Sequence, residues 1–312
     1  MPEAIQLSLF SDAPVDTSKE AKVKWSYSRR QTLNQCARRY YYEYYGASAR
    51  LATADPQKED LRFLKTLSNR YLRSGDILHI AIRLFYKHGE DSSNWLVDWA
   101  RRTYRADYEY SRGGPLPNKD YPPVMLLEFH YNHPDADALY TESENRLLDA
   151  LQTFLTSPAY AAARYGGRCP SAKVEEWILV EIPAFSARGK VDLAYPQNDE
   201  YTIVDWKTGR GATPRQSLQL AFYALWAVET QGYRPESVTL CRGQLTDGSL
   251  KSMAVTDRFL SRVRARIAQD LECMCVLDEY GREGIVGVFS PCGFSKVCRL
   301  CPYQGICSDV AI

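Results

Sequence analysis

The sequence has almost no excess of one charge sign and no long hydrophobic run. Lys and Arg number 39 and Asp and Glu 38, so the net charge is +1 and a nucleic-acid partner has to be argued from local patches. No apolar run approaches the about 20 residues of a membrane span. The first residues lack the basic segment and apolar stretch of a secretory signal. We therefore expect a cytoplasmic protein without a membrane partner.

The composition is otherwise that of a globular protein. With 312 residues, 45% of them hydrophobic and 25% charged, the chain is neither wholly disordered, nor collagen, nor coiled coil, and it shows no internal repeat. Nine cysteines are many for a compartment in which thiols stay reduced. Metal or cluster ligation therefore explains some of them better than a disulfide framework.

The order of expected elements predicts a mixed α/β domain. We interpret residues 1–22 as a flexible tail and 23–312 as one domain, with a helical insertion at about 85–170 and a cysteine cluster at 292–312. Hydrophobic spacing predicts helices at 29–45, 61–71, 76–86, 94–110 and 213–230, and strands at 174–183, 185–195, 201–205, 237–242 and 250–255. Gly75 is expected at a turn or close contact between two helices. Helices, then strands, a helix and strands indicate a sheet with helices around it.

Two aspartates and a lysine end neighbouring strands of this plan. The segment G-K-V-D ends at Asp192, and I-V-D-W-K contains Asp205 and Lys207. The turn between them makes the strands antiparallel neighbours, so both carboxylates can converge on one hard cation such as Mg²⁺. Lys207 shares a face with Asp205 because alternate strand residues do. It could orient or help deprotonate a metal-bound water, or offset charge on a phosphate.

Other polar residues could join this site. Gln219 and Tyr223 are one helical turn apart, where they could hold a DNA phosphate or brace Lys207. His79 lies on an expected helix. Glu176 is our choice for an extra acid over Glu175 and Glu181, although strand alternation alone does not decide among the three.

The ordered set of motifs resembles RecB-family nucleases of the PD-(D/E)xK superfamily. The residues that carry the resemblance are Gly75-x-x-x-His79, Glu176, Gly189-x-x-Asp192, Asp205-x-Lys207 and Gln219-x-x-x-Tyr223. It implies a restriction-endonuclease-like central mixed sheet flanked by helices. It also implies that His79, Asp192 and Asp205 bind Mg²⁺ or Mn²⁺, that Lys207 is the catalytic lysine, and that Gln219 and Tyr223 contact DNA or support the site.

The C-terminal cysteines form a C-x₂-C-x₅-C array of Cys298, Cys301 and Cys307. Three thiolates this close can reach one metal centre, and Cys36 is the candidate fourth ligand, with Cys292 as a competitor. Four cysteines suit zinc or an iron–sulfur cluster, and the residues alone do not separate the two.

A second resemblance concerns these cysteines. The sequence S-Y-S at 26–28, leading to Leu33-x-x-Cys36-x-x-Arg39, together with the terminal array, resembles the iron-staple subgroup. That subgroup includes AddB-type helicase–nuclease subunits and CRISPR-associated exonucleases. The resemblance implies a [4Fe–4S] cluster on Cys36, Cys298, Cys301 and Cys307 that staples the first helix to the C-terminus. Ala37 stands where proline often follows the first cysteine of that subgroup. We expect this difference to be harmless, because proline is not a ligand.

We therefore expect a metal-dependent DNA nuclease, an exonuclease on single strands or ends, in repair, recombination or CRISPR adaptation, with a helicase or CRISPR-adaptation partner. The segment from Arg29 to Tyr45 is crowded with arginine and tyrosine, which suits phosphates and unstacked bases. Packed tyrosines and solvated arginines are the alternative there. The alternative function is a catalytically weak DNA-binding or scaffold subunit of a repair or CRISPR complex.

Overall fold

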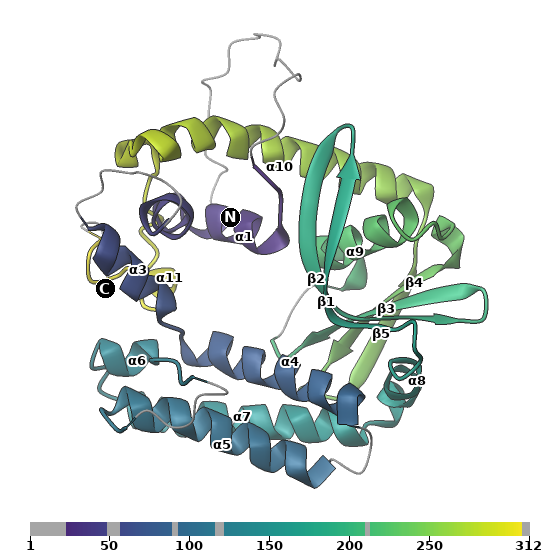
Figure 1. Cartoon of the computed structure of the whole chain (residues 1–312), viewed down its shortest axis with the longest axis horizontal. Helices are drawn as coiled ribbons and strands as arrows, with labels where there is room; N and C mark the ends of the chain where they lie inside the picture. The colour runs from purple at the N-terminus through teal and green to yellow at the C-terminus, as the bar shows by residue number, and fades with distance from the viewer. Residues whose placement is uncertain (1–22, 49–56, 89–92, 116–121, 210–212, 308–312) are drawn as a thin grey trace.

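The computed structural model describes residues 23–48, 57–88, 93–115, 122–209 and 213–307. The expected tail at 1–22 lies outside them. Figure 1 shows a sheet at one side, the long helix α10 (Asp257–Glu283) along the top, and α4 (Arg70–His88), α5 (Ser93–Ser111) and α7 (Ala136–Thr156) along the bottom. No helix in the described ranges is long and apolar enough to cross a membrane.

The sheet is mixed and has the strand order β1-β2-β3-β4-β5. The strands are β1 (Lys173–Ile182), β2 (Phe185–Gln197), β3 (Glu200–Lys207), β4 (Val238–Gln244) and β5 (Ser249–Ala254). Only the β3–β4 pair is parallel, because α9 (Leu218–Glu229) returns the chain between them. The prediction of an α/β fold with a mixed sheet flanked by helices is confirmed.

Each face of the sheet is covered by helices. On one face α9 and α10 contribute buried residues such as Leu225 and Ile267 to a core with Val191 and Ile203 of the strands. On the other face α4 and α7 pack with Val204 and Trp206. Short helices complete this second layer: α6 (Leu127–His130) and α8 (Ala161–Gly166).

The two ends of the described chain share a third core. It joins α1 (Tyr27–Gln35), α2 (Ala37–Tyr41), the π-helical turn η1 (Tyr42–Gly46) and α3 (Lys58–Thr66) to the residues around α11 (Ser295–Cys298). Tyr40, Tyr41, Tyr42 and Tyr45 are almost fully buried in it beside Phe289. The tyrosines therefore pack between elements, and the hypothesis that they stack on DNA bases is wrong.

The arginines of the same segment are engaged in the protein as well. Arg29 donates to the hydroxyl groups of Tyr40 and Tyr45, at 2.8 and 2.9 Å. Arg30 forms an ion pair with Asp270 at 2.7 Å, and Arg38 donates to the Phe289 carbonyl. This basic segment holds the fold together through contacts within the chain.

Two local expectations are corrected. Gly75 lies inside the continuous helix α4, and no atom lies within 4 Å of the position that a Cβ would take. The helix begins before Gly75 because Asn69 caps it by accepting from the Leu72 N–H. Helical structure at 29–45 is interrupted at Cys36, whose extended backbone (φ −164°) caps α2 through its sulfur. The break turns the Cys36 side chain out of the helical register.

Candidate active site and cysteine cluster

The β2–β3 hairpin positions the two aspartates. Its tight turn runs through Asn198, whose φ of 57° is the left-handed conformation that such hairpin turns require. The register pairs Leu193 with Val204, so Asp192 and Asp205 lie on adjacent strands at the same level. Gly189 on β2 lets α9 approach closely, because a Cβ there would lie 2.7 Å from the Phe222 ring.

Asp205 has the environment of a metal ligand. Its side chain is fully buried, and within the described part of the chain Oδ1 is engaged by an ion pair while Oδ2 has no hydrogen-bond partner. The Lys207 ammonium lies 2.7 Å from Oδ1. Buried carboxylate oxygens normally have partners, so unused lone pairs at this position fit a hard cation.

Asp192 and His79 form the second part of the site. The Trp206 backbone N–H donates to Asp192 Oδ2 at 2.8 Å, and Oδ1 lies 3.8 Å from His79 Nδ1. Burial raises the pKa of Asp192 to about 6, although the His79 charge opposes this. Burial disfavours the charge on His79, but Asp192 and Glu175 outweigh it and raise the pKa of His79 to about 9.

The structure places Glu175 at this site and Glu176 outside it. Glu175 Oε1 accepts a hydrogen bond from Nδ1–H of His79 at 2.6 Å, while Oε2 lies 2.5 Å from the Lys190 ammonium. Glu176 points to solvent with its side chain 47% exposed and pairs with Lys173. The choice of Glu176 as the extra acid is therefore corrected to Glu175.

A backbone irregularity causes this exchange. Glu175 has a φ of 50°, the left-handed region that non-glycine residues rarely adopt. Ile178 and Val180 face the core, and regular alternation would point Glu176 inward with them. The turn at Glu175 reverses the faces. Strain of this kind accumulates where a site needs a particular side chain.

Gln219 and Tyr223 brace the site from α9. The Gln219 amide donates to the Tyr223 hydroxyl at 2.7 Å, and that hydroxyl donates to the Lys190 carbonyl on β2. Burial raises the pKa of Tyr223 well above its ordinary value, so the hydroxyl stays protonated. These contacts fix the segment that carries both Asp192 and the Glu175 partner Lys190.

Sequence reasoning did not include Arg242. It stands on β4 directly beside Asp205 in the parallel register, and it is only 9% exposed. Burial and the Arg242 charge both lower the pKa of Lys207. The negative charges of Asp205 and Asp192 outweigh them, so the pKa of Lys207 is raised. The sequence signal for Arg242 was its position as a charged residue directly after the apolar part of an expected strand. It became informative only once β4 was known to be parallel to β3.

The described residues offer one compact group of potential metal ligands. His79, Glu175 and Asp192 each place a ligand atom within 4.8 Å of the others. A hollow of about 830 Å³ is lined by Leu78 of α4 and by Thr208 and Gly209 after β3, and none of the site's side chains lines it. The compact ligand group fits a divalent cation, and Asp205, on the adjacent strand, is not part of this group among the described residues.

The predicted cysteines line a common pocket. Cys36, Cys298, Cys301 and Cys307 contribute to it, and so does Cys292, whose sulfur lies 4.0 Å from that of Cys298. All are free thiols, and burial raises the pKa of Cys301 to about 12. No three of these sulfur atoms lie within 4.8 Å of one another in the described chain. Zn–S bonds of 2.3 Å in a tetrahedron would bring sulfurs to about 3.8 Å.

Comparisons with known proteins give one family match. A family model described as the PD-(D/E)XK nuclease superfamily matches residues 24–308. A solved structure titled "Crystal structure of SSO0001" is similar at 16% identity and a TM-score of 0.29, covering 58% of this chain and 78% of that one. No curated protein matches.

Proposed function

Because the chain belongs to the PD-(D/E)XK nuclease superfamily, we propose that it hydrolyses phosphodiester bonds in DNA with a divalent metal, Mg²⁺ or Mn²⁺. His79, Asp192 and Asp205 would hold the metal, and Lys207 would be the catalytic lysine. The single observation that carries this proposal is the Asp205 carboxylate. It is fully buried, its Oδ1 lies 2.7 Å from the Lys207 ammonium, and its Oδ2 has no hydrogen-bond partner in the described chain.

The side chains have separable roles. A bound divalent cation supplies Lewis acidity toward a phosphate and lowers the pKa of a coordinated water. Lys207 stays charged at neutral pH because Asp205 and Asp192 raise its pKa. Its ammonium therefore offsets negative charge that develops on the phosphate, rather than removing a proton from water.

Glu175 and Tyr223 act through other residues. Glu175 accepts the Nδ1 proton of His79, which leaves Nε2 as the nitrogen available to a metal. Tyr223, held by Gln219, fixes the β2 backbone at Lys190. We propose both as positioning residues of the site.

We further propose that the enzyme is an exonuclease on single strands or ends, working with a helicase or CRISPR-adaptation partner. The proposal rests on the resemblance described above. We also propose a [4Fe–4S] cluster on Cys36, Cys298, Cys301 and Cys307. The four cysteines line one pocket, so their thiolates can converge on one cluster. Visible absorbance and iron analysis of anaerobically purified protein test this, since zinc gives neither signal.

The experiment that tests the function is cleavage of 5′- and 3′-labelled DNA strands with Mn²⁺. Lys207→Ala and Asp205→Asn should each lower the rate at least 100-fold while strand binding persists, as loss of charge stabilisation typically does. Lys173→Ala is the matched control, because Lys173 forms an exposed pair with Glu176. Cleavage by Lys207→Ala at the wild-type rate would refute the site. Binding without cleavage by the wild-type protein would establish the alternative, a DNA-binding scaffold subunit.

A further inference from the structure

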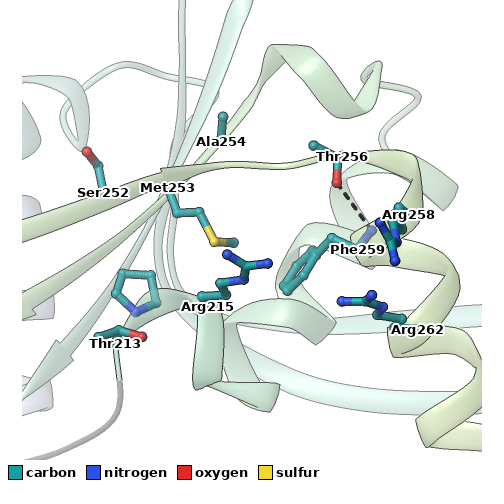
Figure 2. Close-up of a pocket in the computed structure, with 10 residues that line it drawn as sticks. Thr213, Arg215, Ser252, Met253, Ala254, Thr256, Arg258, Phe259 and Arg262 are labelled. Atoms are coloured by element: carbon teal, nitrogen blue, oxygen red, sulfur yellow. Dashed lines mark hydrogen bonds between the residues drawn. The ribbon is translucent and has the colours of Figure 1, made fainter.

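A basic hollow of about 400 Å³ lies at the free edge of the sheet, where β5, the 3₁₀ turn η4 (Pro214–Gln216) and the first turns of α10 meet. We call it the arginine pocket, after Arg215 of η4 and Arg258 and Arg262 of α10. Figure 2 shows the three guanidinium groups around Phe259 and Met253. No acidic residue of the described chain lines it.

These arginines differ from their neighbours on α10. Arg264 pairs with Glu229 at 2.9 Å, Arg266 with Asp270 at 3.0 Å, and Arg282 with Asp278 at 2.6 Å. Within the described ranges no carboxylate pairs with the three arginines of the arginine pocket, and all three are exposed. Three like charges around one concave surface repel one another, so an anion there would relieve that repulsion.

The helix adds to the positive field. Thr256 caps α10 by accepting from the Phe259 N–H at 3.2 Å, the dashed line in Figure 2. The N-terminus of this 27-residue helix carries partial positive charge. Asp257 lies in the same turn but does not line the pocket. Phe259 and Met253 give the hollow an apolar side on which a nucleobase could lie.

The arginine pocket is connected to the candidate active site through the sheet. In the strand register, Asp205 on β3 lies beside Arg242 on β4, and Arg242 lies beside Lys251 on β5. Strands are about 4.8 Å apart, so Lys251 lies roughly 10 Å from Asp205. Met253, two residues further on the same face, already lines the pocket. Arg215 stands in the segment that leads from Lys207 to Gln219. Arg242 and Lys251 therefore lie between the buried Asp205 carboxylate and the arginine pocket.

We propose that the arginine pocket binds backbone phosphates of a single DNA strand, some nucleotides away from the bond that is cleaved, with a base against Phe259. The identity of the strand rests on the proposed function. A single strand fits better than a duplex, because its bases are free to contact an aromatic side chain. The pocket anchors long substrates and takes no part in the chemical step.

The test compares two substrates in Arg258→Ala/Arg262→Ala and in the control Arg101→Ala/Arg105→Ala. The control removes the same charge from exposed arginines of α5. Bis(p-nitrophenyl) phosphate, a single phosphodiester, reports the metal site with Mn²⁺. Fluorescence anisotropy of a labelled (dT)₂₀ strand, measured without metal, reports binding as salt is varied. Thermal melting checks that the variants fold.

We expect the double variant to hydrolyse the small diester at the wild-type rate. Its slope of log affinity against log salt should shrink by about 1.4, and its affinity for (dT)₂₀ at 0.1 M salt should fall about 25-fold, for two lost single-strand phosphate contacts. Arg258→Lys/Arg262→Lys should retain most of the affinity. An unchanged slope, or a loss no larger than that of the control, would overturn the proposal. Displacement of (dT)₂₀ by polyglutamate as readily as by unlabelled (dT)₂₀ would overturn it too, in favour of an acidic protein partner. Failure of the wild-type protein to hydrolyse the small diester, or labelled DNA in the cleavage assay above, would refute the proposed function alone, because the binding measurement needs no cleavage.

Discussion

Two adjacent glutamates make a sharp test of the site, because their side chains point to opposite faces of β1. Glu175→Ala removes the acceptor that orients the His79 ring through a 2.6 Å hydrogen bond. Loss of a carboxylate that orients a metal-binding histidine typically costs about 10–100-fold in activity. This corresponds to roughly 1.4–2.7 kcal/mol. We therefore expect cleavage at saturating Mn²⁺ to slow by that factor.

A second readout separates this role from general damage to the fold. Glu175 and Asp192 together raise the pKa of His79 to about 9 in the metal-free protein. In Glu175→Ala the pKa of His79 should fall well below that value, because burial, the largest influence on this pKa, lowers it and only Asp192 then raises it. The chain has only four histidines, so NMR titration can follow each ring.

Glu176→Ala is the matched control. It removes an exposed ion pair with Lys173, which is worth about 0–1 kcal/mol. Neither the rate nor the titration of His79 should change. If Glu176→Ala slowed cleavage and Glu175→Ala did not, the assignment of the inward-facing acid would be wrong. Saturating metal is essential, because removing Glu175 also makes His79 easier to deprotonate and so favours metal binding at pH 7.

Three further predictions follow from the same geometry. The Mn²⁺ association constant should rise about tenfold per unit between pH 7 and pH 9 and level off above, because a metal must displace the proton that His79 holds up to a pKa of about 9; a flat calorimetric profile would contradict this. Cys301→Ser should abolish the visible absorbance and lower the melting temperature, whereas Cys275→Ser, an exposed thiol of α10, should leave both unchanged; colour retained without Cys301 would exclude it as a ligand. Asp107→Ala should cost about 3–5 kcal/mol in urea unfolding, because it leaves the mostly buried Arg73 guanidinium without the two hydrogen bonds that it donates to the buried Asp107 carboxylate. The exposed Asp98→Ala control should cost less than about 1 kcal/mol.

The sheet and most of its helices could be predicted because local signals agree with the fold. The expected strands at 185–195 and 201–205 correspond to β2 and β3, and the expected helix at 213–230 contains α9. The adjacency of Asp192 and Asp205 followed from the hairpin, since a short turn forces its strands together. The residues at the ends of predicted strands are where this reasoning was most informative.

The remaining features depend on information that periodicity does not contain. Glu175 reaches the site only through one left-handed residue, which reverses the alternation that regular strands obey. Arg242 depends on which strand lies beside β3, and parallel pairing joins segments separated by a helix. Burial of Tyr40 to Tyr45 depends on contacts with residues near the C-terminus, such as Phe289. Long-range packing decided each of these.

The cysteines that line the common pocket are synthesised at different times, because they are far apart in the sequence. Cys36 leaves the ribosome roughly 260 residues before Cys298, which at 5–20 residues per second is a delay of roughly 10 to 50 s. The whole sheet emerges during that interval, while the early thiol has none of its later neighbours. A group bound by all of these sulfurs could therefore be enclosed only after translation has passed Cys307, when the sheet has already been synthesised.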